Sequence, residues 1–444
     1  MNSNTEVRGR SFMAQRPGTF AFYRIVPRLV CPGENNRHNR RASRATMTQE
    51  NHTSAPVNRA LIALLSACAG LSVASLYYNQ PLLGALADEF HASPSSIGRL
   101  PTWTQLGYAA GILLLNPLGD RFDRRKVILI KMALLAVGLF ALGFAKTLGQ
   151  LCVMSLLVGT AASLAQDCVP AAAAIAPDRL RGKVVGTVMT GLLLGILLSR
   201  VVSGAVAEQF GWRAVFVMAA ISVSALFAIT YVRLPTFEPS TNLSYSGLLY
   251  SLFSLFRAHQ ALRRATLGQL LLSSAFSAFW STLALMLHKA PFYYGSHIVG
   301  LFGLAGAAGA LSARFAGTLA DRKGPELVLR AGACLVFVSF VGFTLAPESL
   351  LLLVAGTLLF DLGLQACVVS HQSIIYALDA GARSRVNAVF IGGMFAGMAG
   401  GSTIGSLVFT RAGWRGVCAY AALAAIAALF LRLLPARGVA ALAK

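Results

Sequence analysis

The chain of 444 residues is 56% hydrophobic and only 12% charged, with a mean hydropathy of +0.65. Soluble domains are roughly 45–50% apolar and about 25% charged, so this composition excludes an ordinary soluble protein and predicts one that crosses a membrane several times. A formal net charge of +22 would suit a nucleic-acid-binding protein, but the basic residues are spread through loops between apolar segments, which argues against that class.

Residues 1–56 differ from the rest of the chain, because they are rich in arginine, polar and without apolar periodicity. This composition fits a disordered basic tail, and it also fits an organelle-targeting segment. A third interpretation, which we favour, is that translation starts at Met47. No cleavable secretory signal is evident, since the first apolar segment is long enough to span a bilayer.

Twelve apolar segments follow the tail. A hydrocarbon core of about 30 Å needs ~20 apolar residues per helix, and each segment is about that long. We therefore expect an all-α integral membrane fold with twelve transmembrane helices. It forms two six-helix halves at 57–233 and 265–436, a cytoplasmic linker at 234–264 and a tail at 437–444. The segments are 60–81, 99–118, 127–145, 151–176, 184–206, 212–232, 266–287, 298–316, 327–346, 350–376, 387–409 and 414–434.

The basic residues favour one side of these segments. Of 38 lysines and arginines, 31 fall in the termini and in alternate loops on one side, 6 fall in the opposite loops and Arg200 lies inside a span. Cytoplasmic loops carry such an excess. We therefore expect both termini in the cytoplasm and a bacterial inner (plasma) membrane as the location, with lipid rather than nucleic acid as the partner of the basic loops.

The second half repeats the first. Asp120 and Asp321 lie 201 positions apart in a shared Leu-x-Asp-Arg pattern, and Gly-Trp-Arg at 211–213 returns 202 positions later at 413–415. Together with a third pattern, these offsets of 201 and 202 positions indicate a duplicated unit of about 200 residues. In apolar chains such repeats are typical of transporters. The third pattern is a row of small residues: Gly191, Gly195, Ser199 and Ser203, then Gly393, Gly397, Gly401 and Gly405.

Motifs for enzymatic chemistry are absent from the sequence. Seven cysteines are an odd number, and no Cys-x-x-Cys or Cys/His ligand spacing occurs, so we expect no metal and no cofactor. A nucleophile elbow, His-Glu-x-x-His and the phosphate-binding Gly-x-x-x-x-Gly-Lys loop are also missing, so neither an enzyme nor an ATP-driven pump is expected. A sensor would need an added domain, for which the linker is too short; its segment 248–256 is predicted to be an amphipathic helix on the inner surface.

The loop motif resembles that of a known family. Residues 116–126 read Asn-Pro-Leu-Gly-Asp-Arg-Phe-Asp-Arg-Arg-Lys and residues 317–324 read Gly-Thr-Leu-Ala-Asp-Arg-Lys-Gly. Both are similar to the signature loop of the major facilitator superfamily, although Asn116 and Asp123 stand where glycines are usual and Pro325 and Glu326 replace a basic pair. The glycine row and the phrase Leu-Tyr-Tyr-Asn-Gln-Pro at 76–81 resemble the drug and sugar efflux branch of proton antiporters.

This resemblance implies moving parts. The Asp120 carboxylate is expected to accept hydrogen bonds from a neighbouring helix N-terminus or an arginine, and to act as a latch between the halves. Each small-residue row forms one helix face, which either packs within its own half or slides against the other half; the family fold favours sliding. The remaining loop residues are predicted to share the latch or to hold topology and bind anionic headgroups: Arg121, Arg124, Arg125, Asp321 and Arg322.

Three ionisable residues lie well inside the predicted spans: Asp167, Arg200 and Asp361. Each costs about 2.5–3.5 kcal/mol to insert, so each is a candidate for function. At 1.5 Å per residue, Arg200 and Asp361 lie ~24 and ~22 Å from the cytoplasmic ends of their helices, and Asp167 lies ~13 Å from its own. We therefore expect Arg200 and Asp361 to share a central cavity, with Asp361 as first and Asp167 as second choice of proton carrier. The alternative is a fixed structural pair.

Seven further residues are candidates for lining that cavity, since helices 1, 4, 7 and 10 line it in the family that the chain resembles. The four on helix 1 have an alternative role in an interfacial belt. His371 and Gln372 are expected to be polar groups at a helix end. The seven candidates are Tyr77, Tyr78, Asn79, Gln80, Gln166, Trp280 and Gln365.

These observations predict a monomeric secondary transporter that exports a small molecule, a drug-like compound or a sugar, in exchange for protons. Its mechanism is alternating access, in which the halves rock around a site near the middle of the membrane. The alternative is a proton-coupled importer of a sugar or organic anion with the same fold. Neither the direction of transport nor the substrate follows from the helices.

Overall fold

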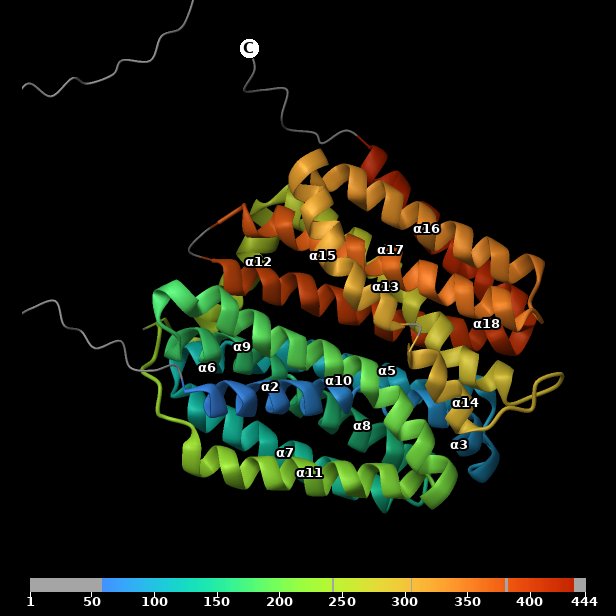
Figure 1. Cartoon of the computed structure of the whole chain (residues 1–444), viewed down its shortest axis with the longest axis horizontal. Helices are drawn as coiled ribbons and strands as arrows, with labels where there is room; N and C mark the ends of the chain where they lie inside the picture. Colours follow the sequence, from blue (N-terminus) through green and yellow to red (C-terminus); the bar gives the residue numbers. More distant parts are fainter. Residues whose placement is uncertain (1–57, 242, 305, 380–381, 435–444) are drawn as a thin grey trace, which may run out of the picture. The chain divides into compact units, whose positions relative to one another are not determined.

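The computed structural model describes residues 58–241, 243–304, 306–379 and 382–434, and every regular element in these ranges is a helix (Figure 1). The predicted all-α membrane fold is thereby confirmed for the described chain. The tail at 1–56, with the proposed start at Met47, and the C-terminal tail at 437–444 lie outside the described residues.

The first half consists of six spans. Some are single helices, whereas the first, second and fourth are each made of consecutive shorter pieces. The first span consists of α2 Arg59–Ala74, η1 Gln80–Leu82 and α3 Leu83–Glu89, and the short α4 Pro94–Ile97 follows it. The second span consists of α5 Arg99–Ala110, η2 Gly111–Leu115 and α6 Leu118–Arg121, the third is α7 Arg124–Gly143, and the fourth consists of α8 Leu148–Ala162 and α9 Leu164–Ile175. After the short η3 Asp178–Leu180, the fifth span is α10 Arg181–Phe210 and the sixth is α11 Trp212–Arg233.

The second half follows the linker helix α12 Tyr245–Ala258. Its elements are α13 Gln260–Leu287, α14 Ser296–Leu301 with η4 Phe302–Leu304 and α15 Gly306–Lys323, α16 Pro325–Leu345, α17 Leu350–Tyr376 and α18 Arg383–Leu433. The 51 residues of α18 contain two spans that meet at Gly413, whose φ of 62° breaks the helix. Gly211, with φ 80°, joins α10 to α11 in the same way. Both positions need glycine because other residues rarely adopt positive φ.

The broken spans explain why length and hydropathy alone find fewer helices. Eight described helices are long and apolar enough to cross a membrane, with α8 and α9 counted together and α18 counted once. The other three spans are interrupted. Pro81 lies in η1 after a turn at 75–79, the wide turn η2 and Pro117 interrupt the second span, and η4 interrupts the eighth. Each of the twelve predicted segments overlaps one of these helices or helix groups.

The small-residue rows pack within their own halves. A Cβ atom on Gly195 would lie 2.1 Å from the carbonyl oxygen of Gly70 on α2, and one on Gly401 would lie 2.0 Å from that of Ser274 on α13. The expectation that these rows face the opposite half is therefore wrong. Each row instead lets a backbone approach closely inside one six-helix unit. The exception on α10 is Gly204, which contacts the backbone of Ser296 and Gly300 in the second half.

Contacts between the halves concentrate away from the loop motifs. We call the end of the helices at which Asp120 and Arg322 lie the basic end, and the other the opposite end. Toward the opposite end, α5 runs beside α18 and α10 beside α14 (Figure 1). There the Ser402 hydroxyl donates to the carbonyl of Gly98 over 2.9 Å, and the hydroxyls of Thr102 and Thr403 are 3.0 Å apart.

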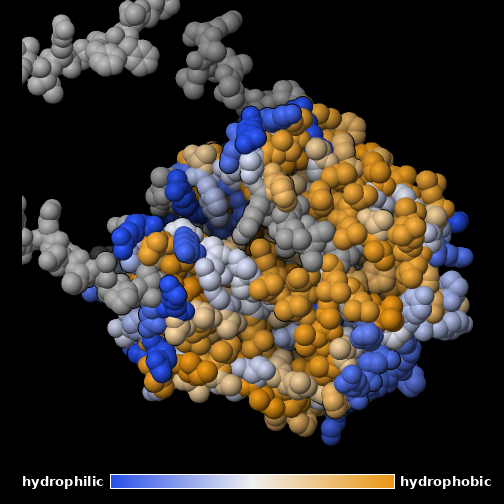
Figure 2. Space-filling model, viewed as in Figure 1, coloured by the Kyte–Doolittle hydropathy of each residue, from blue (hydrophilic) through white to orange (hydrophobic). Residues whose placement is uncertain are grey.

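The exposed surface is that of a lipid-embedded protein. Figure 2 shows hydrophobic residues over the middle of the visible face and hydrophilic residues toward its two ends. Large apolar side chains are exposed along single helices, such as Ile130 and Val137 on α7, with exposed fractions of 61% and 68%. Soluble monomers rarely expose such continuous apolar area, and a bilayer is the solvent in which it is stable.

The glycine contacts predict that an alanine substitution lowers the stability of the protein at one glycine of α10 but not at another. Gly195→Ala forces α10 away from α2, and overpacking of this kind costs about 1–3 kcal/mol; we expect a lower Tm of the purified protein. Gly186→Ala is the matched control, because no described atom lies within 4 Å of its added Cβ, and it should leave Tm unchanged or raise it. Tryptophan fluorescence during heating measures both. Equal Tm values for the two variants would contradict the close helix approach.

Candidate functional site

Two buried polar clusters lie at different depths in the molecule. The basic-end cluster consists of Asn116, Asp120, Arg124, Lys131 and Asp167, all in the first half. The central cluster consists of Tyr77, Gln80 and Arg200 from the first half and Trp280 and Asp361 from the second. The central cluster therefore joins the halves.

The loop motif is fixed by its own side chains. Asp123 caps α7 by accepting a hydrogen bond from the backbone N–H of Arg125 over 3.0 Å, and it also accepts one from Phe237 in the linker over 3.0 Å. Aspartate is among the preferred residues at a helix start. Asp123 stands where the family has glycine, and the structure gives this departure a role in tying the linker to the loop.

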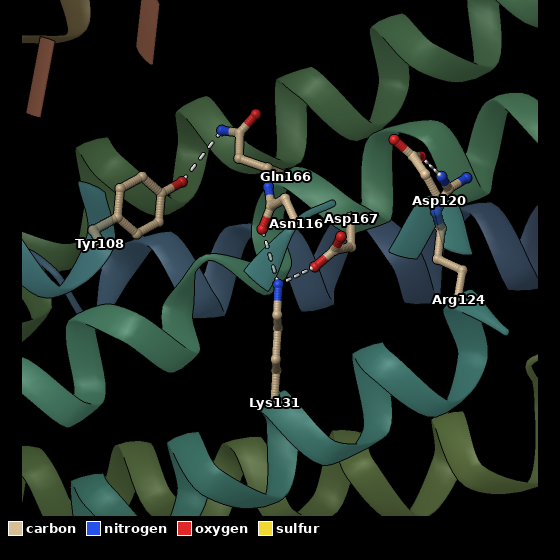
Figure 3. A network of polar contacts seen from close by, with 7 residues as sticks. All are labelled: Tyr108, Asn116, Asp120, Arg124, Lys131, Gln166 and Asp167. Atoms are coloured by element: carbon tan, nitrogen blue, oxygen red, sulfur yellow. Dashed lines mark hydrogen bonds and ion pairs between the residues drawn. The ribbon is translucent and has the colours of Figure 1, made fainter. Parts of the chain in front are cut away.

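Asp120 pairs with an arginine of its own half. Its Oδ1 lies 2.7 Å from Nη2 of Arg124, one turn later (Figure 3). Arg121 is exposed, whereas Arg125 reaches across to donate to the carbonyl of Tyr231 at the end of α11 over 2.6 Å. Of the two partners expected for Asp120, the structure therefore contains the arginine.

Lys131 is a functional candidate that the sequence analysis missed. Its Nζ lies 2.7 Å from Oδ2 of Asp167 and donates to Oδ1 of Asn116 over 2.8 Å (Figure 3). Both charged side chains are only 3% exposed. Arg200 is thus not the only cation inside the described spans, and Asp167 is not an isolated acid. The missed signal is the spacing, because Lys131 lies two helical turns after Arg124 on the same face.

The basic-end cluster borders a cavity between the halves. The cavity has a volume of about 50 Å³. Asn116, Asp120 and Asp167 line it from the first half, and the first turns of α18 line it from the second, with Ser384 and Asn387. Gln166 also lines this cavity and donates to the hydroxyl of Tyr108 over 3.2 Å. Asp120 therefore faces the N-terminal end of a helix in the other half across a gap.

The second copy of the motif is arranged differently. Asp321 and Arg322 are exposed, and within the described part of the chain neither has an ion pair. Glu326 instead lies 3.3 Å from the guanidinium of Arg432 on α18. The pairing that holds the first loop is thus not repeated, since Pro325 and Glu326 replace the basic pair there.

Arg200 is the centre of the second cluster. It is 3% exposed, and its Nε donates to Oε1 of Gln80 over 2.7 Å. Its guanidinium lies over the ring of Trp280 at 4.1 Å and near the ring of Tyr77 at 4.7 Å. Such contacts between a cation and a ring stabilise a desolvated charge. The structure therefore brings together Tyr77, Gln80, Trp280 and Arg200, four of the predicted residues.

Asp361 on α17 completes this cluster without closing an ion pair. Its charge interacts with that of Arg200, yet the ion pairs of the described residues do not include one between Asp361 and Arg200 within 4.0 Å. Four buried polar atoms of the cluster have no hydrogen-bond partner among the described residues. They are Oδ1 of Asp361, Nη2 of Arg200, Nε2 of Gln80 and Nε1 of Trp280. Buried polar groups normally have partners, so this group of four unpartnered atoms makes the central cluster a candidate binding site.

The remaining predicted residues have mixed positions. Tyr78 and Asn79 are buried, with Asn79 donating to Thr104 over 3.1 Å, so the alternative of an interfacial belt on helix 1 is wrong. Gln365 is half-buried, one turn from Asp361 on the same helix face. His371 is 1% exposed with Nδ1 3.0 Å from Oε1 of Gln269, so it is not a simple helix-end group.

Glu89 organises the opposite end of the first half. It accepts hydrogen bonds from Nε1 of Trp212 at 2.5 Å and from Arg213 at 2.7 Å. Partial desolvation raises the pKa of Glu89, but these two hydrogen bonds and the charge of Arg213 outweigh it and lower the pKa below the usual value. The first Gly-Trp-Arg pattern thus anchors the start of α11. Nearby, Asp88 pairs with His288 of the second half at 2.8 Å.

Comparison with known proteins agrees with this architecture. Residues 62–379 match the model of the Major Facilitator Superfamily. The chain is 42% identical over 373 residues to the uncharacterized transporter YgaY of Escherichia coli O157:H7, covering 84% of this chain and 94% of that protein. Among solved structures, the nucleoside transporter NupG has a TM-score of 0.68 at 16% identity, covering 84% of this chain and 99% of that one. The human organic anion transporter MFSD10 has a TM-score of 0.65 at 16% identity, with coverages of 85% and 100%.

The Lys131–Asp167 pair predicts a strong effect on stability. Lys131→Met leaves the Asp167 charge buried without a partner, which costs about 3–5 kcal/mol, so we expect a large fall in Tm of the purified protein. The double variant Lys131→Met with Asp167→Leu removes both charges and should recover most of the loss. Lys146→Met is the control, because that side chain is exposed. A Tm for Lys131→Met equal to that of the control would refute a buried ion pair.

Proposed function

Because this chain belongs to the major facilitator superfamily and is a membrane transporter of that type, we propose that it moves a small solute by proton-coupled alternating access. The observation that carries the proposal is the central cluster, in which Arg200 and Asp361 come from different halves and are both nearly fully buried. Ionisable groups inside a membrane protein mark substrate and proton pathways. We propose that the chain works as a monomer, since both halves are in one chain.

Alternating access is supported by the uneven contact between the halves. They touch through Gly98, Thr102 and Gly204 toward the opposite end, whereas a cavity separates Asp120 from α18 at the basic end. A site in the middle then opens to one side at a time. The excess of basic residues at the basic end supports its placement in the cytoplasm. Bacterial relatives favour the inner membrane.

Asp120 is proposed to act as the latch at the basic end. It faces Ser384 and Asn387 at the start of α18 across the cavity, and a helix N-terminus attracts a carboxylate. Arg124 holds this carboxylate in the present arrangement over 2.7 Å. Closing the cavity would let Asp120 reach the α18 N-terminus. The exposed Asp321 and Arg322 have no such facing helix among the described contacts and are not proposed to share this role.

Asp361 is the proposed proton carrier. One of its carboxylate oxygens has no partner, whereas Asp167 is held by Lys131 at 2.7 Å. A carboxylate that already forms a buried ion pair exchanges its proton less readily, because protonation would leave the lysine charge uncompensated. Arg200 interacts with the Asp361 charge, so a solute that binds Arg200 changes the proton affinity of Asp361.

Two directions of coupling have separate support. Export of a drug-like compound or sugar in exchange for protons is favoured by the likeness of residues 76–81 and the α10 row to the efflux branch. Proton-coupled import of a sugar or organic anion is favoured by the buried Arg200, since a fixed cation suits an anionic solute. The structural neighbours include a nucleoside and an organic anion transporter, so the shared fold leaves the substrate open.

Proton movement distinguishes the two directions. In everted membrane vesicles, respiration acidifies the interior and a pH-sensitive dye reports the gradient, while drugs, sugars, nucleosides and organic acids are tested one at a time. A compound that dissipates the gradient when added outside indicates exchange; one that does so only when loaded inside indicates joint movement. We expect the response to disappear in Asp361→Asn and to persist in the control Asp321→Asn, whose side chain is exposed.

The outcome that would contradict this role of Asp361 is a full response in Asp361→Asn. If the response were then lost in Asp167→Asn, the proton would belong to the basic-end cluster. No response to any compound, with the protein shown to be inserted, would overturn proton coupling.

A cysteine pair tests alternating access. In a cysteine-free background, Thr102→Cys with Thr403→Cys should crosslink under mild oxidation, because the two hydroxyls are 3.0 Å apart. The disulfide would hold the opposite end closed, so solute uptake into proteoliposomes should fall to background and return with a reducing agent. The controls are the single variants Thr102→Cys and Thr403→Cys, which cannot form this disulfide and should keep their transport under the same oxidant. Undiminished transport by the crosslinked protein would contradict the rocking motion.

A further inference from the structure

We propose that the central cluster is an anion-binding site, and that the transported solute is a small organic acid whose carboxylate binds between Arg200, Gln80 and Trp280. This inference rests on the proposed transport function and names the class of its substrate. It is drawn from the unpartnered atoms of the cluster rather than from any relative.

The unpartnered donors around Arg200 form one group. Nη2 of Arg200, Nε2 of Gln80 and Nε1 of Trp280 are all buried N–H groups without an acceptor among the described residues. Gln80 contacts the guanidinium through its other atom at 2.7 Å, and the Trp280 ring lies 4.1 Å from the guanidinium carbon. One donor on the guanidinium and two on the residues that contact it suit an oxyanion, since a carboxylate accepts several hydrogen bonds and pairs with arginine in a planar fork.

A purely structural role for Arg200 explains these atoms less well. A fixed contact between Arg200 and the rings would stabilise the charge, but it would leave each of the three donors without an acceptor. Burying a donor without a partner is costly, and the cost is removed only when an acceptor enters. The residues that hold Arg200 are themselves buried, with exposed fractions of 1% for Gln80 and 2% for Trp280.

The aromatic residues around the three donors indicate what the rest of the solute, apart from its carboxylate, is like. Tyr77, Phe276 and Trp280 have rings 4.7, 5.8 and 4.1 Å from the guanidinium carbon. Phe276 also packs near Phe360, with ring centroids 6.1 Å apart. Ligand sites of this type combine an apolar wall with a few polar groups that fix orientation. We therefore infer a carboxylate on a flat or compact apolar body, rather than a polyhydroxylated sugar.

The position of Asp361 determines how the anion and the proton are coupled. Among the described residues, Arg200 and Tyr77 are the charged or titratable groups that interact with Asp361. An anion bound to Arg200 beside a charged Asp361 would place two negative charges in one buried site. Protonation of Asp361 therefore increases the affinity of Arg200 for the anion, and the bound anion increases the affinity of Asp361 for the proton to the same extent. The acid and the proton are then transported together, which favours the import candidate over exchange.

Binding to the purified full-length protein tests the site. Benzoate, 4-hydroxybenzoate and hexanoate are each compared with their uncharged amides at pH 6 to 8, where all three acids are ionised, and the concentration dependence of Tm gives the affinity. We expect at least one acid to raise Tm while its amide does not. For the wild type, affinity for that acid should increase as the pH falls, and this dependence should be lost in Asp361→Asn.

Two tryptophan variants separate the site from general effects. Trp280→Phe keeps the ring and removes one donor, so it should weaken acid binding about tenfold, as expected for the loss of one hydrogen bond to a charged group. Trp414→Phe is the matched control, because Nε1 of Trp414 is also buried without a partner but lies outside the cluster; it should not change binding. Arg200→Gln should abolish acid binding, with circular dichroism showing that the variant is folded.

Three results would overturn the anion site: no acid binds, the amides bind as well as the acids, or Trp280→Phe and Arg200→Gln both bind the acid as tightly as the wild type. Uptake of the bound acid into proteoliposomes, driven by an acid exterior, distinguishes this inference from the proposed function. If the acid binds but is not taken up under any gradient, the proposed transport function is refuted and the anion-binding site is supported. If only neutral solutes are taken up, the proposed transport function is supported and the anion-binding site is refuted.

Discussion

The cost of a charge in the membrane interior governs this structure. An ionised side chain surrounded by hydrocarbon needs an opposite charge, hydrogen bonds or an aromatic face. Lys131 and Asp167 satisfy each other, with Asn116 as a third partner, in a side-chain network that is 3% exposed at both charges. Arg200 is satisfied only in part, by Gln80 and by rings. In the first network the two charges have partners, whereas the second has buried polar atoms without a partner among the described residues.

The duplicated halves use one geometry for different purposes. Arg200 contacts Gln80 between α10 and the end of the first span, and 202 and 201 positions later Ser402 contacts Ser281 between α18 and α13 at 2.8 Å. Both halves have a polar contact at this crossing, and only the first half has a charge there. The glycine rows behave in the same way, since both press a helix against the first helix of its own half. The two halves therefore share one fold and differ in charge at this crossing.

Much of this architecture could be predicted from the sequence, because bilayer thickness fixes helix length and the repeat fixes the division into halves. The all-helical fold and the superfamily were confirmed. The depth argument predicted that Arg200 lies near Asp361 rather than Asp167, and in the structure the charges of Arg200 and Asp361 interact. Side-chain partners were harder to predict. Lys131 lies near the start of the predicted span 127–145 and was not among the ionisable residues predicted well inside the spans, so its pairing with Asp167 was missed. The prediction that the small-residue rows slide against the opposite half was wrong, because a row of small residues permits a helix to approach closely without determining which helix it is.

The single-residue joints at Gly211 and Gly413 have a consequence for the membrane itself. Each links an inner helix, α10 or the first part of α18, to an outer helix with no intervening loop. The outer helix α11 exposes Ile221 and Val232 to lipid, with exposed fractions of 61% and 76%. A joint of one residue leaves no slack, so any tilt of α10 is passed to α11 and changes the outline that the protein presents to the acyl chains. Under the proposed alternating access, bilayer thickness and lateral pressure would act on the equilibrium between the two conformations, and lipid composition would affect the transport rate.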